Sequence, residues 1–400
     1  MSSHLPDAAR TRTRAIHAGE EPDPVTGASA PNIVMSTTFS VDEPKRFSAM
    51  EQVDDEGFMY TRWGNPTVRQ LEVKLAALEW ADDCRAYASG MAAISALLLT
   101  RLSPGDRLVV GDVVYPGTAE LAHHTLPRMG VEVEKVDTSD PAAVEAVLGR
   151  PASLVWVETP ANPIMRITDI ATVADLAHAA GADLVVDSTF ATPIATRPLE
   201  LGADYVVHSL TKYIGGHGDA LGGAVLSDRD RLAHLDLEAT VHYGGVISPF
   251  NAWLVMRGAA TLPIRMAAHE AGALAMARAL EGHEGVTGVT YPGLESHPQH
   301  DLARRQMDNF SGMLTFKVED GPAVAERMTK ELRVIHYAVS LGHHRSLVYW
   351  MPTEDLMRSS YHLEGDALEA YRSFAGDGVF RLSVGLEDPD DLIEDLHSVL

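Results

Sequence analysis

DYVVHSLTKYIGGHGDALGGAVLS, residues 204–227, is the stretch that decides the fold of this chain. It contains two short apolar runs, 204–209 and 222–227, and between them Lys212 stands in a turn of hydroxyl residues and glycines. A continuous apolar run of this length is typical of a strand that is buried on both faces of a sheet. We therefore expect Lys212 to lie just beyond the end of a buried strand.

The same kind of run recurs upstream and alternates with helical segments. Further strands are expected at 107–112, 131–137, 153–158 and 183–187. A short helix is expected at 141–149, and a longer helix at 167–181 ends at a glycine. This alternation indicates a parallel or mostly parallel sheet with helices on both faces, and such sheets bind ligands beyond the carboxyl ends of their strands.

Helical periodicity begins near residue 66, and a second helix is expected from Met91 to Leu102. After residue 256 the pattern changes to one long helix over 257–282, strand-like stretches at 311–320 and 379–387, and three further helices. Those three helices are expected at 321–332, 364–375 and 388–400.

Three parts of the chain follow from these patterns. Residues 1–60 lack sustained periodicity and are expected to form an extended arm that packs on a neighbouring subunit. Residues 61–256 are expected to form the ligand-binding domain, and residues 257–400 a smaller α/β domain.

Composition narrows the classes of function. A net charge of -24 argues against nucleic-acid partners and against an anionic membrane surface. No stretch has the length of a membrane span, and the first residues lack a secretory apolar region, so we expect a cytoplasmic protein. Cys84 is the only cysteine. The adjacent pairs His123–His124 and His343–His344 do not share a helical face, so no metal site is expected.

Polar side chains follow three neighbouring strands of the expected sheet. Glu158, Asp187 and Ser209 each come at the carboxyl end of a strand, and Lys212 lies three residues further on. A single Asp in this position is usually a cap, and a single loop Lys is usually solvated. The combination is more specific, because consecutive strands would bring these groups to one crevice.

This set suits pyridoxal phosphate. Its aldehyde forms a Schiff base with a lysine, for which Lys212 is the candidate. Its ring nitrogen stays protonated beside a buried carboxylate, for which Asp187 is the candidate. Its phosphate needs hydroxyl groups and free backbone N–H groups, and its ring needs a stacking partner. The candidates for these two tasks are Ser209, Thr211, Gly90 and Met91 for the phosphate and Tyr115 for the ring.

The chain also resembles a known family over nearly its whole length, from residues 15–28 to residues 381–388. The resemblance rests on YTRWGNPT, ASGMAAI, YPGT, ETPANP, DSTFATP, HSLTKYIGGHGD, SPFNAWLVMRG and RLSVGLED. These motifs are similar to those of the Cys/Met-metabolism (trans-sulfuration) enzymes that use pyridoxal phosphate. The resemblance implies the aspartate-aminotransferase-like fold type I, with a large, mostly parallel sheet domain and a smaller C-terminal α/β domain.

The resemblance also implies roles for single residues. Lys212 would anchor the cofactor and shuttle protons, and Tyr115 would stack on the ring and help to deprotonate the substrate amine. Arg381 would bind the substrate α-carboxylate, with Ser340 beside it. The cofactor would further be held by Tyr60 and Arg62 (on the phosphate of the neighbouring subunit), Gly90, Met91, Asn162 (near the ring hydroxyl), Asp187, Thr189, Ser209 and Thr211.

Two positions depart from the family pattern. Arg345 stands in SLGHHRSL where such enzymes usually have Glu, so it would repel a distal ammonium group of a substrate and attract an anion. Alternatively, Arg345 turns away and pairs with Glu354 or Asp355. Gly117 stands where methionine γ-lyases often have cysteine, which weakens an assignment to methionine alone.

The resemblance leaves two reactions open. The first is γ-elimination from a homoserine- or homocysteine-derived amino acid such as cystathionine or methionine, or one with a non-standard γ-substituent. The alternative is γ-replacement, as in cystathionine γ-synthase or O-acyl-homoserine sulfhydrylase. Enzymes of this kind are usually homotetramers built from dimers that share active sites.

Overall fold

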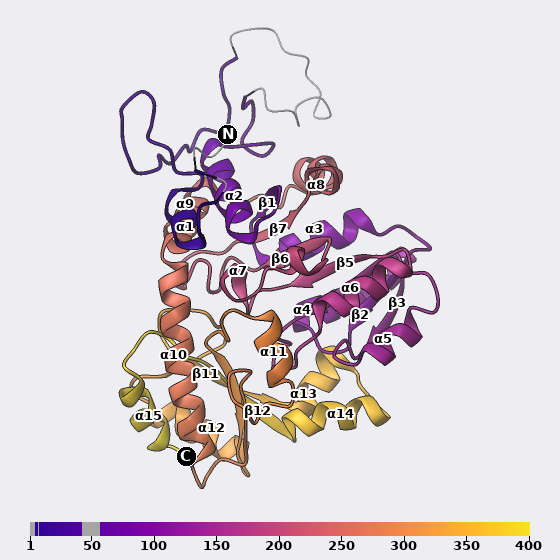
Figure 1. Ribbon diagram of the computed structural model, residues 1–400, viewed down its shortest axis with the longest axis vertical. Coiled ribbons are helices and arrows are strands. Elements are labelled where there is room, and N and C mark those ends of the chain that lie inside the picture. Colours follow the sequence, from indigo (N-terminus) through magenta and orange to yellow (C-terminus); the bar gives the residue numbers. More distant parts are fainter. Residues whose placement is uncertain (1–4, 7, 42–56) are drawn as a thin grey trace.

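The computed structural model describes residues 5, 6, 8–41 and 57–400, and it contains two β-sheets (Figure 1). The larger has seven strands in the order β1-β7-β6-β5-β4-β2-β3, and the smaller has five in the order β10-β11-β12-β9-β8. The strands are β1 (Asp83–Tyr87), β2 (Arg107–Gly111), β3 (Glu132–Val136), β4 (Leu154–Glu158), β5 (Asp183–Asp187), β6 (Tyr205–His208), β7 (Gly223–Ser227), β8 (Gly288–Thr290), β9 (Met313–Lys317), β10 (His336–Tyr337), β11 (Leu347–Pro352) and β12 (Gly378–Ser383).

Helices surround both sheets. The α-helices are α1 (Thr11–His17), α2 (Pro66–Glu79), α3 (Gly90–Arg101), α4 (Pro116–Glu120), α5 (Pro141–Val147), α6 (Ile170–Ala179), α7 (Thr192–Ala195), α8 (Arg229–Leu235), α9 (Pro249–Ala260), α10 (Leu262–Glu281), α11 (His300–Gln306), α12 (Gly321–Glu331), α13 (Thr353–Leu356), α14 (Gly365–Ala375) and α15 (Pro389–His397). The π- and 3₁₀-helical turns are η1 (Leu121–Thr125), η2 (Pro127–Met129), η3 (Pro198–Leu201), η4 (Asp236–Tyr243) and η5 (Met357–Tyr361).

The six strands expected between residues 107 and 227 are confirmed as β2 to β7. Strands β3, β2, β4, β5 and β6 are parallel, whereas β7 and β1 run antiparallel to their neighbours. Strand β1 was not expected, because its sequence DCRAY carries two charged residues and no continuous apolar run. The fold is the mixed α/β arrangement that the motifs implied, with a large, mostly parallel sheet and a smaller second sheet.

Alternate residues of the large sheet build separate cores on its two faces. Trp156, Val185 and Val207 pack with α3 on one face. Val155 and Val186 pack with α5 and α6 on the other face. Both sets are buried, which explains why these strands read as continuous apolar runs rather than as an alternation of apolar and polar residues.

The long helix expected over 257–282 is wrong in one respect, because two helices occupy this region. Helix α9 ends at Ala260, and α10 begins at Leu262 with Pro263 in its first turn. A proline lacks the N–H that would continue the preceding helix, so the break falls at Thr261. In Figure 1, α10 runs from the region of the large sheet to that of the small sheet.

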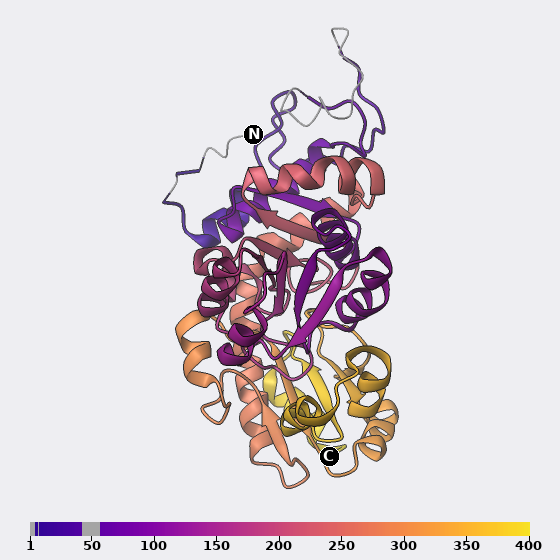
Figure 2. The same ribbon diagram turned by 90° about the vertical axis from the view of Figure 1, so that its right-hand side faces the viewer.

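The N-terminal segment was expected to be extended, but it contains one short helix. Its short helix α1 is held by Lys74 of α2, which is completely buried and donates to the backbone oxygen of Ala15 and forms an ion pair with Glu20. The parts of the expected arm at 1–4, 7 and 42–56 lie outside the described residues. In Figure 2 the described part of this segment that follows α1 lies at the end of the molecule opposite the C-terminus.

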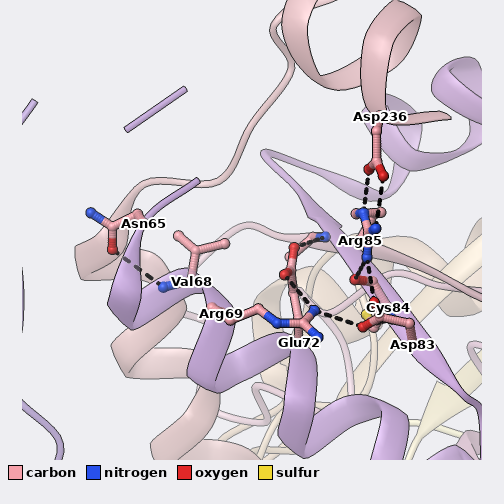
Figure 3. A network of polar contacts seen from close by, with 9 residues as sticks. Asn65, Val68, Arg69, Glu72, Asp83, Cys84, Arg85 and Asp236 are labelled. Atoms are coloured by element: carbon pink, nitrogen blue, oxygen red, sulfur yellow. Dashed lines mark hydrogen bonds and ion pairs between the residues drawn. The ribbon is translucent and has the colours of Figure 1, made fainter. Parts of the chain in front are cut away.

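A network of charges joins α2, β1 and η4 beneath this arm (Figure 3). Arg85 of β1 forms ion pairs with Asp236 and Asp83, and Arg69 reaches Asp83 and Glu72 of its own helix. Burial raises the pKa of the Glu72 carboxyl, and the two arginines oppose this shift. Removing one partner would leave a buried charge uncompensated, so the network fixes α2 against the sheet.

The division of the chain at residues 60 and 256 stays a prediction. None of the helices within the described ranges combines the length and the hydropathy needed to cross a membrane.

Candidate active site

The site begins at the carboxyl ends of β4 and β5, where two buried carboxylates lie side by side. Glu158 is the register partner of Asp187. Glu158 accepts hydrogen bonds from the backbone N–H groups of Tyr115 and Asn162, the latter at 3.0 Å. Burial and the nearby Asp187 raise the pKa of Glu158 well above its usual range. Glu158 therefore holds together the two segments that carry Tyr115 and Asn162.

The position of Asp187 suits a carboxylate that pairs with a cationic ring nitrogen. The backbone N–H of Thr189 donates to its Oδ1 at 3.0 Å, and burial raises the pKa of Asp187. A cation beside a buried carboxylate restores its charged form, and a protonated pyridine nitrogen is such a cation. Thr189 also links this carboxylate to the next strand, since its Oγ1 accepts a 2.9 Å hydrogen bond from the backbone N–H of Ser209.

Lys212 meets the C-terminal part of the chain at this point. Its Nζ donates to Ser340 Oγ at 3.0 Å. Burial, together with the charge of Arg381, lowers the pKa of Lys212 to about 8. An amine with this pKa is partly unprotonated near neutral pH, which both nucleophilic attack and proton transfer require.

Arg381 lies next to this lysine, on β12, and is almost completely buried. Its Nη1 donates to Asn162 Oδ1 at 2.8 Å, and its Nη2 donates to the carbonyl oxygen of Ser340 at 3.2 Å. Both partners are neutral, and burial lowers the pKa of Arg381. A buried guanidinium with neutral partners is suited to receive an anion such as a carboxylate.

The loop that carries Ser340 has an unusual backbone. Ser340 has φ 141° and Gly342 has φ 72°. A Cβ added to Gly342 would lie 2.5 Å from the backbone nitrogen of Tyr213, so only glycine allows the loop to approach the lysine turn this closely. Ser383 Oγ, which accepts from the Gly342 N–H at 2.9 Å, fixes the loop to β12.

The N-terminus of α3 and Ser209 form a cradle with the chemistry that a phosphate needs. A Cβ added to Gly90 would lie 2.9 Å from both Cβ and Oγ of Ser209, so glycine alone permits this approach. Ser89 caps the helix by accepting from the Ala92 N–H. The N–H groups of Gly90 and Met91, in the first turn, have no partner within the helix and are available to an anion.

Thr211 is already engaged at the edge of this cradle, since its hydroxyl exchanges hydrogen bonds with the backbone N–H and oxygen of Gly222. The cradle, the buried Asp187 and the low-pKa Lys212 together fit pyridoxal phosphate. Lys212 would hold its aldehyde carbon, Asp187 its ring nitrogen and the Gly90–Ser209 cradle its phosphate.

Gly90→Ala is expected to weaken cofactor binding by about tenfold or more, because the new methyl group displaces Ser209 from the cradle. Titration of the stripped protein with pyridoxal phosphate, followed by visible absorbance, measures this. Gly282→Ala is the matched control, since a Cβ there would have no neighbour closer than 3.7 Å. An unchanged dissociation constant in Gly90→Ala would place the phosphate elsewhere.

Tyr115 caps the amino end of α4, and its ring is partly exposed. A side chain at Gly117 would meet this ring at 2.6 Å and Met91 Sδ at 2.8 Å, so Gly117 leaves both side chains in place. Burial raises the pKa of Tyr115, and the charge of Glu120 adds to this shift. Glu120 Oε1 in turn accepts a 2.8 Å hydrogen bond from Ser360 Oγ of η5.

Tyr60 and Arg62 lie on the arm side of the molecule. The Arg62 guanidinium is 5.5 Å from the centre of the Tyr60 ring and donates to the carbonyl oxygen of Val241 in η4. Contact of these residues with a neighbour's phosphate stays a prediction.

The side chain of Arg345 is exposed. The partners suggested for it are engaged elsewhere, since Glu354 accepts from Arg372 and Asp355 from Arg358. The role of Arg345 in substrate choice therefore also stays a prediction.

Two residues that lie in the site were not predicted from the sequence, because only the fold places them beside Asn162 and Ser340. Tyr361 donates to the backbone oxygen of Asn162 at 2.9 Å, and His343 lies against Ser340. Glu158 was recognised at a strand end but received no role. The position of Tyr361 had no signal in the sequence, because 199 residues separate it from Asn162. His343 could have been suspected from its place in the loop that contains Ser340.

Comparisons with known proteins identify the family of this chain. Residues 12–400 match the family described as Cys/Met metabolism PLP-dependent enzyme. A canavanine γ-lyase of Rhizobium leguminosarum bv. trifolii is 42% identical over 97% of this chain and 95% of its own length. A cystathionine γ-synthase of Mycobacterium bovis is 41% identical over 97% of this chain and 96% of its own.

A solved structure shows the same fold. Cystathionine γ-synthase from Xanthomonas oryzae pv. oryzae, in complex with aminoacrylate and cysteine, has a TM-score of 0.87 and 36% identity, covering 98% of this chain and 97% of its own. The chain therefore belongs to the Cys/Met metabolism family of enzymes that depend on pyridoxal phosphate.

Proposed function

We propose that this enzyme catalyses γ-elimination from a homoserine-derived amino acid whose γ-substituent ends in a cationic group. The reaction consumes one water, and its products are an α-keto acid, ammonia and the γ-substituent released with a proton. The carboxylate of Glu120, beside Tyr115, is the observation that carries the choice of substituent. The relative named canavanine γ-lyase supports it, because canavanine carries a guanidinium group at its far end.

Three residues of the chain have separate roles in substrate binding and proton transfer. Arg381 binds the α-carboxylate and thereby orients Cα toward Lys212. Lys212 Nζ removes the Cα proton and moves protons between carbon atoms, for which its pKa of about 8 suits it. Tyr115 stacks on the ring of the cofactor. Because burial raises its pKa, Tyr115 takes a proton from the substrate amine only as the phenolate, which the positive charge of Arg381 favours. Pyridoxal phosphate, when bound, supplies the electron sink that makes the Cα proton acidic.

We assign to Glu120 the recognition of the far end of the substrate. It follows Tyr115 on α4, and its second carboxylate oxygen is left for a ligand while Oε1 accepts from Ser360. A cation would be attracted to this position, and an acyl group that ends in a carboxylate would be repelled. This preference is opposite to the one expected from Arg345, and we give Glu120 the larger weight because Arg345 is exposed whereas Glu120 lies beside Tyr115.

The second candidate is γ-replacement, in which a thiol takes the place of the leaving group. The cystathionine γ-synthases of similar sequence and fold favour it. A substrate with an uncharged acyl group, such as O-acetyl-homoserine, would be compatible with Glu120, whereas O-succinyl-homoserine would not.

The test is a substrate panel of canavanine, methionine, cystathionine, O-acetyl-homoserine and O-succinyl-homoserine, each assayed for α-keto acid and ammonia with and without a thiol. We expect rapid keto-acid release without thiol and the highest kcat/KM for the cationic substrate. A new thioether that forms only with thiol, with little keto acid alone, would establish the synthase instead.

Glu120→Gln is expected to lower kcat/KM for the cationic substrate by about fivefold, because an exposed ion pair contributes about 1 kcal/mol. Values for methionine should stay the same. Glu331→Gln, at an exposed position at the end of α12, is the control. Equal loss for charged and neutral substrates would show that Glu120 does not contact the γ-substituent.

We further propose a cytoplasmic homotetramer of dimers that share active sites, in which Tyr60 and Arg62 of one subunit reach the phosphate of the next. The length of the arm supports this assembly. Sedimentation equilibrium tests the size of the assembly, and a stable monomer with full activity would contradict it.

A further inference from the structure

Helix α10 carries two polar side chains, Arg265 and His269, that are almost completely buried. Residues four apart lie on the same face of a helix, about 6 Å apart along its axis. Arg265 contacts the turn that follows Lys212, and His269 contacts the chain that follows Arg381. One turn of α10 is therefore in contact with both parts of the site.

Arg265 binds the backbone of the lysine turn. Its Nη1 donates to the carbonyl oxygen of Tyr213 at 2.7 Å, and its Nη2 donates to that of Ile214 at 3.2 Å. Nη2 also donates to the carbonyl oxygen of Gly258 at 2.7 Å, and Nε donates to Thr261 Oγ1 at 2.9 Å. The two residues that follow the lysine are thus tied to the junction of α9 and α10.

Glycines allow this turn to lie directly against the two helices. A Cβ added to Gly216 would lie 2.2 Å from Arg265 Nη1, and a Cβ added to Gly258 would lie 2.1 Å from the carbonyl oxygen of Gly215. Gly216 also has φ 71°, a conformation that side chains disfavour. The position of the lysine turn is therefore set by contact with α9 and α10.

His269 binds the chain just beyond the strand that carries Arg381. Its Nδ1 lies 2.8 Å from the carbonyl oxygen of Val384 and 3.2 Å from that of Gly385. Burial lowers the pKa of His269 to about 4, so the ring is neutral near neutral pH and Nδ1 carries the hydrogen that it donates. The His269 ring also meets the ring of Tyr213 edge to face, with centroids 5.1 Å apart.

The environment of Arg265 favours a role in positioning. Within the described part of the chain, the partners of its guanidinium are three carbonyl oxygens and one hydroxyl group. Burial lowers the pKa of Arg265 to about 10. Burying a cation among neutral partners costs free energy, whereas the planar guanidinium fixes the direction of several acceptors at once.

We propose that Arg265 and His269 are positioning residues that set the separation between the Lys212 amine and the Arg381 guanidinium. Arg381 holds the substrate α-carboxylate and Lys212 acts on Cα, so this separation decides whether Nζ reaches the Cα proton. The inference rests on the roles proposed above for Lys212 and Arg381, and it holds for elimination and for replacement alike.

Exchange of the Cα hydrogen tests the inference without any leaving group. L-Norvaline, whose γ-methyl group cannot leave, is incubated with the holoenzyme in D₂O and followed by NMR. Arg265→Met should slow Cα exchange at saturating norvaline about 10²-fold and change the dissociation constant of norvaline less than about twofold. Arg265→Lys, which keeps a donor group, should lie between. Arg278→Met, at an exposed position of the same helix, is the control.

A free amine separates positioning from a general loss of structure. In Lys212→Ala, added methylamine takes the place of Nζ and is not attached to the turn. Arg265→Met should therefore not slow the amine-supported Cα exchange further in this background. If Arg265→Met slowed exchange to the same degree with the lysine and with the free amine, Arg265 would not act through Lys212 and the proposal would be wrong.

Two substitutions of His269 examine the second contact. The Nδ2 of asparagine can occupy the place of the imidazole Nδ1, so His269→Asn should keep most of the Cα exchange. His269→Leu, which has no donor, should slow it about tenfold. Equal rates in the two variants would show that the hydrogen bond to the end of β12 does not set the site.

The cofactor-free protein gives a measurement that is independent of turnover. The N–H groups of Gly215 and Gly216 donate within the lysine turn, to the carbonyl oxygens of Leu210 and Lys212. Their exchange with D₂O, followed by mass spectrometry of a peptide that covers 208–223, should speed up about tenfold in Arg265→Met and not in Arg278→Met. Unchanged exchange in Arg265→Met would overturn the proposal. Neither norvaline nor the cofactor-free protein releases a γ-substituent, so these outcomes are independent of whether the enzyme proves to be a lyase.

Discussion

Lys212→Ala is expected to abolish turnover, with kcat reduced at least about 10⁴-fold. The alanine variant loses both the amine that holds the cofactor aldehyde and the group that moves protons between substrate carbons. Single-turnover release of keto acid from the best substrate of the panel measures the loss. Lys330→Ala, at an exposed lysine paired with Glu326, is the control and should retain wild-type activity.

Borohydride treatment of the holoenzyme gives a result that does not depend on the substrate. Reduction should attach the cofactor covalently to the peptide that contains Lys212 in the wild type, and no peptide should be labelled in Lys212→Ala. If another lysine carries the label in the wild type, the site assigned to Lys212 is wrong.

The lowered pKa of Lys212 also sets a pH dependence. Because burial and Arg381 favour the neutral amine, the cofactor-free protein has its nucleophile unprotonated at a lower pH than an exposed lysine would. The rate of recombination with pyridoxal phosphate should therefore rise through a pH of about 8 and level off above it. Stopped-flow absorbance measures this rate, and an apparent pKa near that of an exposed lysine would contradict the buried position.

Arg381→Lys is expected to lower kcat/KM by about 10²- to 10³-fold, mostly through KM. A lysine keeps the charge but loses the planar pair of N–H donors that a carboxylate needs. It also leaves Asn162 Oδ1 and the Ser340 carbonyl without their donors. Arg358→Lys, at an exposed arginine paired with Asp355, is the control and should change little.

The carboxamide of the best amino-acid substrate identifies what Arg381 binds. The wild-type enzyme should prefer the carboxylate to the carboxamide strongly, and Arg381→Lys should lose most of this preference. If the variant slowed both compounds to the same degree, Arg381 would act on the loop of Ser340 and not on the α-carboxylate.

The sequence alone predicted the frame of the site with few errors. The strands from β2 to β7 were found because each is buried on both faces and so appears as a continuous apolar run. Lys212 and Asp187 were predicted to share one site because the carboxyl ends of consecutive parallel strands meet at one edge, and strands β5 and β6 are indeed parallel. Errors arose where local signals were weak, as in α1, or where Pro263 was not used to break a long helical pattern.

The part of the site that comes from the C-terminal half of the chain could not be predicted from local sequence patterns. Ser340, His343 and Arg381 come from a different sheet or its loops, and their partners Lys212 and Asn162 are 128 and 219 residues away in the chain. Hydrophobic periodicity and strand-end position are local properties, so they place each group on its own element. Only the packing of the two sheets decides which side chains touch.

The amino-acid sequence by itself determined which functional groups lie at the ends of strands and at the start of a helix. These groups are a carboxylate, a lysine in a glycine turn and an anion site at a helix start, and each follows an apolar segment. Tertiary structure alone decided that Lys212 shares a hydrogen-bonded path with Ser340 and His343, and that Arg345 stays exposed while Glu120 lies beside Tyr115. The physical reason is that burial and electrostatic environment, which set the pKa and the partner of each group, arise from contacts between residues far apart in sequence.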